Sequence, residues 1–219
     1  MIDEIGHRRV VEAIDRIDQK SDGEIYCLVA QEASRYREVP LAWAAIVALV
    51  VPPVAVALGL SPQLILSGGW TAQGGQDLAL SLYAIAQAFL FGVVTLIVSI
   101  RPIRLALTPA FFKSHRVKRL AAQHFVSTGI HLKQSQPHVL ILVSLAERQV
   151  EILADDVIHA VTGPSVWDAA RDVIVSGMRG TDPAGSLVKA VELVGAPLIQ
   201  HFPATPEFPD INANGVGEI

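Results

Sequence analysis

Cysteine is nearly absent from this chain of 219 residues, which holds a single thiol at Cys27. One cysteine excludes a disulfide framework within the chain and a metal site built from several thiolates. Because Cys27 lies in the apolar run 25–30 (IYCLVA), we expect a buried and unreactive thiol there.

Charge is also scarce at 17% of residues, and two runs, 41–60 and 78–100, contain no Asp, Glu, Lys or Arg. Each is about as long as the roughly 20 residues that a helix needs to cross a bilayer. The alternative, two buried helices of a soluble protein, normally shows a polar stripe, and neither run has one. The sequence therefore predicts a transmembrane hairpin joined by the Gly-rich linker 67–77.

Two features inside the predicted spans need comment. Pro52 and Pro53 are tolerable inside a span when neighbouring groups re-satisfy the freed carbonyls. We expect Gln87 in the second run to hydrogen-bond across to the first helix.

The bases that are present gather beside these runs, and they predict an orientation. Arg35 and Arg37 precede the first run, and the linker 67–77 has neither Lys nor Arg. Six bases and no acid follow the second run: Arg101, Arg104, Lys113, Arg116, Lys118 and Arg119. By the positive-inside rule both flanks, and hence both termini, lie in the cytoplasm. Segments 1–40 and 101–219 can therefore meet on one side of the plasma (inner) membrane.

The same basic cluster bears on the partners of the chain. The net charge is −4, and since bases 101–119 adjoin the predicted membrane, anionic lipid is the expected partner there and nucleic acid is not. The first residues, MIDEIGHRR, have no apolar core, so no signal peptide is expected.

Outside the hairpin, apolar periodicity predicts an α/β domain in two pieces, 1–40 and 101–202. We expect two strands flanking a crossover in a two- or three-layer α/β sandwich with a short mixed sheet. A tight turn at Ala146-Glu147 would join the second and third strands, and the proline-containing tail 203–219 is predicted to be disordered. The expected elements are helix 2–17, strand 24–30, helix 111–126, strands 138–145 and 148–154, and helices 164–178 and 183–201, the last two with Pro164 and Asp182-Pro183 as start signals.

The order of these elements resembles the TPM-domain family, whose members open with a helix and a Thr/Ser-Gly-x-Glu-Ile strand. Here that segment reads Ser21-Asp22-Gly23-Glu24-Ile25. The later apolar strand, hairpin arginine and second strand of the family match 139–145, Arg148 and 150–153, and two final helices follow. The chain looks most like a bacterial subgroup of predicted membrane proteins in which two spans split the domain, and the resemblance covers most of residues 1–202.

The resemblance implies several roles. A plant lumenal member is an acid phosphatase, some members bind calcium, and others assist membrane complexes. The chain departs from the family in lacking a signal peptide and in reading Ala154-Asp155-Asp156 where members often have a Gly-rich stretch.

Asp155 and Asp156 are the candidate metal ligands because they follow a strand end, where loops carry sites. Glu24 could approach them from a neighbouring strand. Ca²⁺ takes about six to eight oxygens, so Ca²⁺ or Mg²⁺ binding competes with a solvated loop or a helix N-cap at these positions. The seven histidines form no HxxxH or HxH pair, and Ser144 lacks the Gly-x-Ser-x-Gly context of a nucleophile.

Two functions remain open from the sequence. The first, which we favour, is a membrane-anchored interaction or assembly module that binds a membrane-protein partner or a second copy of itself. The second is a divalent-metal-assisted phosphatase at the membrane surface, which rests on the family resemblance alone. A transporter has little support because the spans carry no charge.

Overall fold

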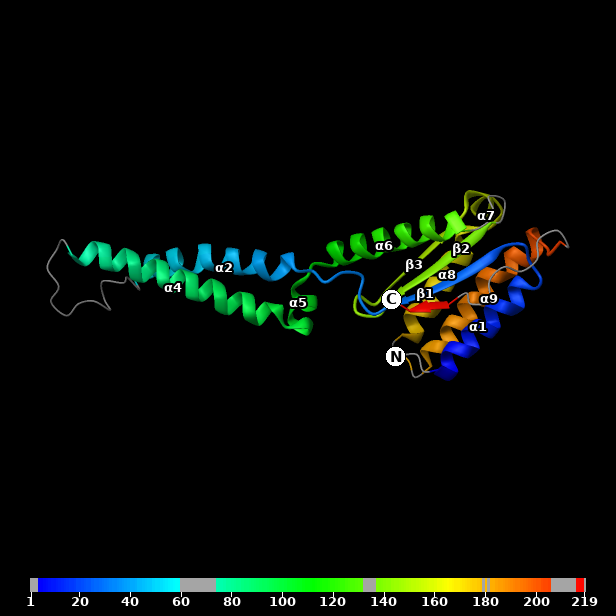
Figure 1. Ribbon diagram of the computed structural model, residues 1–219, viewed down its shortest axis with the longest axis horizontal. Helices are drawn as coiled ribbons and strands as arrows, with labels where there is room; N and C mark the ends of the chain where they lie inside the picture. Colours follow the sequence, from blue (N-terminus) through cyan, green and yellow to red (C-terminus); the bar gives the residue numbers. More distant parts are fainter. Residues whose placement is uncertain are drawn as a thin grey trace. The chain divides into compact units, whose positions relative to one another are not determined.

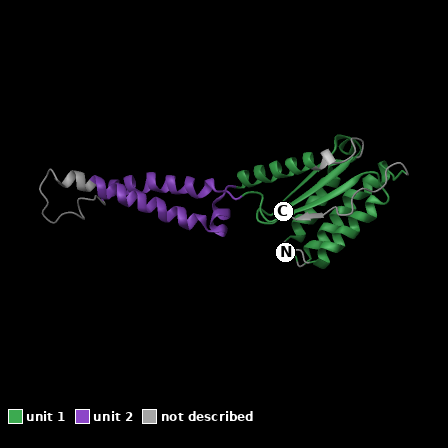
Figure 2. Ribbon diagram, in the orientation of Figure 1, with its two compact units in different colours: residues 1–34, 110–219 green, residues 35–109 purple. Residues whose placement is uncertain are grey.

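The computed structural model describes residues 4–59, 74–131, 137–178, 180, 182–205 and 216–218. It divides the chain into two compact units (Figure 2), one formed by 1–34 and 110–219 and the other by 35–109. The first unit is an α/β domain and the second is helical.

The sheet of the first unit confirms the predicted mixed topology. Its strands are β1 (Glu24–Ala30), β2 (His138–Ser144), β3 (Gln149–Ala154) and β4 (Val216–Glu218), in the order β3-β2-β1-β4. β1 runs parallel to β2 with Glu24 opposite His138, whereas β3 is antiparallel to β2. The insertion therefore separates two strands that are neighbours in space.

The prediction of a disordered tail over 203–219 needs a correction at both ends. At its start, Pro203 forms a β-bridge with Ser21, and Thr205 donates two hydrogen bonds to Asp22. Val216–Glu218 forms β4, which pairs in parallel with Cys27–Val29 on the free side of β1. An unpaired strand edge offers backbone donors and acceptors that favour an added strand, and the tail supplies one. Residues 206–215 and 219 lie outside the described part of the chain.

Helices cover both faces of the sheet and give three layers (Figure 1). α1 (Glu4–Asp18), α8 (Pro164–Gly177) and α9 (Pro183–His201) lie on one face, and α6 (Ala110–His131) lies on the other. Successive side chains of a strand point to opposite faces of the sheet, so each strand contributes to both layers of packing. Ile25 and Cys27 join the main core with α1, α8 and α9. Leu28 and Leu142 pack with Val117 of α6 on the other face.

The predicted helix starts are confirmed at α9. Asp182 is its N-cap, and Oδ1 of Asp182 accepts a hydrogen bond from the Gly185 N–H at 2.8 Å. That backbone donor, followed by the Arg9 guanidinium, lowers the pKa of the Asp182 carboxyl. Arg9 lies on α1, so the cap also links α1 to α9 through a 3.2 Å ion pair.

Cys27 is fully buried, as predicted, and should be inert. Burial raises the pKa of its thiol from 9.0 to about 12, so the reactive thiolate is suppressed near neutral pH. We expect no maleimide labelling of native protein at pH 7 and complete labelling after unfolding, which mass spectrometry can follow. The native state holds the thiol proton more tightly than the unfolded chain does. Ionisation of Cys27 therefore does not lower the free energy of unfolding below pH 9.0. It lowers that free energy as the pH rises from 9.0 towards 12.

The second unit contains α2 (Glu38–Ala57), α4 (Gly74–Ser99) and the short α5 (Arg101–Leu107). α2 and the segment Leu80–Ser99 are long and apolar enough to span a membrane, with mean hydropathies of 2.3 and 2.1. Only 17% and 6% of these windows are buried, whereas the core helices of a soluble protein are mostly buried. α5 was not predicted; α4 ends at Ser99, and Pro102 suits the first turn of a new helix.

Gln87 forms the predicted bond between the two long helices. Its Nε2 donates to the backbone carbonyl of Ala48 at 3.1 Å. In a regular helix this carbonyl would accept from the N–H of residue 52, which is a proline and has none. The side chain of Gln87 therefore satisfies the carbonyl that Pro52 leaves free.

This bond predicts a coupling between Gln87 and Pro52. Gln87→Leu should destabilise the helix pair by about 0.6–2 kcal/mol, measured by denaturant titration in detergent. In a Pro52→Ala background the restored N–H bonds Ala48, so the penalty should fall. Pro53→Ala restores a different bond, to residue 49, and serves as the matched control without coupling. Equal penalties in all three backgrounds would contradict the assignment.

Candidate functional site

Chemically active side chains meet at the end of the sheet where β1 and β2 begin. Glu24 lies opposite His138 in the parallel register, and Asp155 directly follows Ala154, which is paired with Val139. Residues in register share a face of the sheet, so Glu24, His138 and Asp155 all lie on the face covered by α6. The structure thus places Glu24 and Asp155 on either side of His138.

His138 is fixed from several directions. Its side chain is buried, and its ring stacks on Phe125 of α6 with centroids 4.3 Å apart. Nδ1 lies 2.8 Å from Oδ2 of Asp155, and the same oxygen accepts the His138 backbone N–H at 2.8 Å. The Asp155 N–H in turn donates to the His138 carbonyl. This set of bonds holds the imidazole in one orientation.

The second ring nitrogen has a different environment. Nε2 of His138 is buried and has no hydrogen-bond partner among the residues described. A histidine held by a carboxylate at Nδ1 presents Nε2 as a proton acceptor or a ligand. His138 is therefore the chemically distinctive member of the cluster.

Two of the three predicted metal ligands, Glu24 and Asp155, are engaged by other residues. Glu24 is buried, and its Oε2 accepts the hydroxyl of Tyr26 at 2.5 Å. Asp155 occupies the N-cap position of α7 (Asp156–Val161) without a side-chain cap bond, because its carboxylate faces His138. Asp156 is exposed in the first turn of α7. Within the described ranges, no cluster of three or more His, Cys, Asp or Glu could hold a metal ion.

These residues therefore do not fit a Ca²⁺ shell of about six to eight oxygens. Metal binding by Asp155, Asp156 and Glu24 stays a prediction. Calorimetry tests it directly: a Ca²⁺ or Mg²⁺ heat that Asp155→Ala plus Asp156→Ala abolishes would support the site.

The hairpin between β2 and β3 differs from the predicted tight turn. Ser144 pairs with Gln149, so four residues, 145–148, connect the strands. Glu147 is buried, and its carboxylate accepts from the Ala33 N–H at 3.1 Å and from the Ser144 hydroxyl. Arg148 adopts a left-handed backbone with φ 53°. The four-residue turn lets the buried Glu147 carboxylate reach the Ala33 N–H and the Ser144 hydroxyl. The spacing of apolar residues in the sequence does not reveal this requirement.

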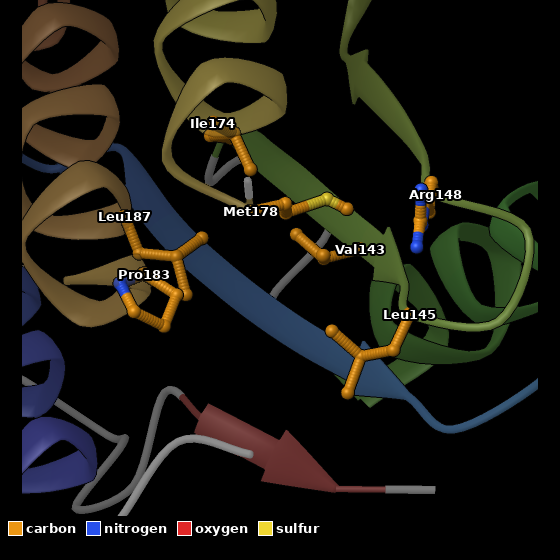
Figure 3. A pocket seen from close by; sticks show the side chains of 7 residues that line it. All are labelled: Val143, Leu145, Arg148, Ile174, Met178, Pro183 and Leu187. Atoms are coloured by element: carbon orange, nitrogen blue, oxygen red, sulfur yellow. The ribbon is translucent and has the colours of Figure 1, made fainter. Parts of the chain in front are cut away.

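A cavity of about 110 Å³ lies beside this turn, on the face of the sheet covered by α8 and α9 (Figure 3). Arg148 stands at one end of the cavity, and Leu187 and Pro183 of α9 stand at the other. The other lining side chains are apolar: Val143, Leu145, Ile174 and Met178. The cavity is separate from the His138 cluster, which belongs to the opposite face and the other end of β2.

Comparison with known proteins gives one structural match. No family model matches the chain, and no curated protein matches its sequence. The NMR structure of BA42 from the psychrophilic bacterium Bizionia argentinensis aligns with a TM-score of 0.54 and 14% identity, over 100% of this chain and 95% of BA42. BA42 is a TPM-like domain protein. The fold resembles a TPM-like domain. At 14% identity the match shows the fold alone, so it supports the family resemblance only as a likeness of fold.

Proposed function

We propose that this chain is an integral protein of the bacterial inner membrane whose TPM-like α/β unit acts as a cytoplasmic interaction or assembly module. One observation carries the proposal: a helical hairpin with large exposed apolar side chains is inserted between two adjacent parallel strands of an α/β domain. An exposed apolar surface of this kind needs a non-aqueous partner. Anchoring at the insertion leaves both halves of the domain on one side.

The polar side chains within the hairpin support a membrane environment. Thr95 and Ser99 donate to the carbonyls of Phe91 and Thr95, and Trp43 Nε1 donates to the Leu107 carbonyl at 3.3 Å. Together with Gln87, they satisfy hydrogen-bonding groups inside the hairpin, as hydrocarbon requires. Trp43 lies near one end of α2, the depth at which tryptophan favours the membrane interface.

The basic segment 101–119 supports contact with anionic lipid. Lys118 and Arg119 of α6 are exposed, and about two turns earlier the same helix exposes Phe111 and Phe112, at 76% and 56%. Bases attract anionic headgroups by about 1 kcal/mol each near the surface, and exposed aromatic rings suit the interface. This combination supports a cytoplasmic position for the segment.

Binding fits the α/β unit better than catalysis does. At the end of the sheet where β1 and β2 begin, Glu24 accepts the hydroxyl of Tyr26, and the carboxylate of Asp155 contacts the backbone N–H and Nδ1 of His138. These side chains are therefore already engaged within the α/β unit. The cavity at the other end is apolar with one arginine at its rim, a composition suited to holding a ligand. The partner is a membrane protein or a second copy of the chain.

Site-specific photo-crosslinking in cells tests the interaction role. A benzophenone amino acid is placed at exposed apolar positions of the α/β unit, such as Val157 and Leu193, and at exposed Arg171 as a polar control. The proposal expects a discrete crosslinked product, a second copy or one membrane protein, from a limited set of positions. The absence of any discrete product from all positions would contradict it.

The phosphatase alternative has its own test. The purified protein is assayed on a generic phosphoester with and without Ca²⁺ and Mg²⁺, beside the Asp155→Ala/Asp156→Ala variant. Divalent-dependent turnover that the double variant loses would replace the interaction proposal with the enzyme.

A further inference from the structure

We propose that the cavity beside Arg148 binds the C-terminus of a partner polypeptide that ends in a short branched aliphatic residue. The inference rests on the proposed interaction role and names the chemistry of the partner. It depends on an apolar recess and an unpaired cation that border each other.

The recess provides the aliphatic half of the site. Val143, Ile174 and Leu187 come from β2, α8 and α9, so its walls are built on regular elements (Figure 3). A cavity of roughly 150 Å³ lined by apolar side chains binds benzene. A volume of about 110 Å³ therefore suits a smaller group such as the side chain of Leu, Ile or Val.

Arg148 provides the charged half. Its side chain is exposed and lines the cavity, and it makes no hydrogen bond or ion pair with the residues described. The adjacent acid, Glu147, forms no ion pair with Arg148; its carboxylate accepts from the Ala33 N–H and the Ser144 hydroxyl. A free guanidinium binds carboxylates through two parallel N–H bonds.

The backbone holds this arginine at a defined place. Arg148 has φ 53°, a conformation that is uncommon for residues other than Gly, Asn and Asp. It is the last residue of the turn, directly before Gln149, which pairs with Ser144. The turn thus keeps an energetically unfavourable backbone that directs a free cation to the rim of an apolar recess, and such strain is a feature of functional sites.

The size of the cavity favours a polypeptide end over a fatty acid. Both carry a carboxylate next to aliphatic carbon, but a long acyl chain exceeds a recess of about 110 Å³. A C-terminal Leu, Ile or Val places one branched side chain in the recess with its carboxylate a few bonds away. Capture of a C-terminal carboxylate is a recurrent mode of peptide recognition.

Methionine NMR offers a direct readout because the chain has only two methionines, Met1 and Met178, and Met178 lines the cavity. Full-length protein carrying ¹³C-methyl methionine is placed in nanodiscs and titrated with N-acetyl-leucine, its neutral amide N-acetyl-leucinamide, and octanoate. We expect N-acetyl-leucine to shift the Met178 signal saturably and to bind at least about tenfold more tightly than the amide.

Two variants separate the halves of the site. Arg148→Asn removes the charge with a residue that tolerates positive φ, and it should abolish the preference for acid over amide. Leu187→Phe fills the recess and should weaken both ligands. Arg171→Gln, which removes an exposed charge from α8 outside the cavity lining, is the matched control and should change neither.

Equal binding of acid and amide, tighter binding of octanoate than of N-acetyl-leucine, or no shift of the Met178 signal would each overturn this inference. The interaction role itself would survive those outcomes, because photo-crosslinking reports it separately. Conversely, loss of crosslinks with N-acetyl-leucine binding intact would contradict the interaction role alone.

Discussion

Replacing Gly177 by alanine is expected to destabilise the α/β unit by about 3 kcal/mol, the upper part of the range for overpacked cores. A Cβ at Gly177 would lie 2.1 Å from the Cβ of Ser186. That atom is fixed to the backbone of α9, so the two helices must move apart. Native-state labelling of buried Cys27 measures the effect: 3 kcal/mol corresponds to roughly a hundredfold faster modification.

Two further variants make this prediction specific. Adding Ser186→Gly to Gly177→Ala removes the clash and should recover most of the lost protection, less about 1 kcal/mol for glycine within a helix. Gly163→Ala is the control, because the new Cβ would meet only Ser165 Oγ, at 3.8 Å. Similar labelling of the Gly177→Ala and Gly163→Ala proteins would show that α8 and α9 are not in close contact there.

Lysines at the middle of both long helices are expected to abolish membrane integration. Leu49 and Phe89 lie near the centres of α2 and of the apolar part of α4, and they are 66% and 73% exposed. A lysine at the centre of a span costs about 2.5–3.5 kcal/mol on insertion scales. The pair Leu49→Lys and Phe89→Lys should therefore move the protein out of the carbonate-resistant membrane fraction.

Matched substitutions distinguish insertion from general damage. Leu49→Met with Phe89→Met keeps both helices apolar and should leave the protein in the membrane. Val157→Lys with Leu193→Lys places the same charges on exposed positions of the α/β unit and should also have no effect. Retention of the Leu49/Phe89 lysine pair in the membrane fraction would mean that these helices do not span it.

Periodic segments of this fold could be predicted from sequence because their signals are local. Glu24–Ala30 and Pro183–His201 have the predicted bounds, since a short β-branched run and a capped start define them within a few residues. β4 was missed because a three-residue strand carries too little pattern, and its pairing depends on the free edge of β1. α7 was missed for the same reason of length.

The candidate site was less predictable because it depends on strand register. Glu24 and Asp155 could be singled out as acids at strand ends. His138 could not, because its role follows from lying between them and under Phe125, contacts between segments far apart in the sequence. The one available signal was that an apolar strand begins with a histidine. The sequence identified Arg148 only as a residue of the hairpin. The cavity beside it could not be predicted, because its walls also come from α8 and α9.

The most direct test of the membrane-anchored account is the sidedness of three added cysteines. Arg8→Cys and Arg171→Cys report on the two halves of the α/β unit, Thr71→Cys reports on the linker, and buried Cys27 adds no background. The account predicts that an impermeant maleimide labels only residue 71 in intact cells and the other two after permeabilisation. Labelling of residue 8 or residue 171 from outside, or protection of residue 71, would contradict a hairpin that returns the chain to one side.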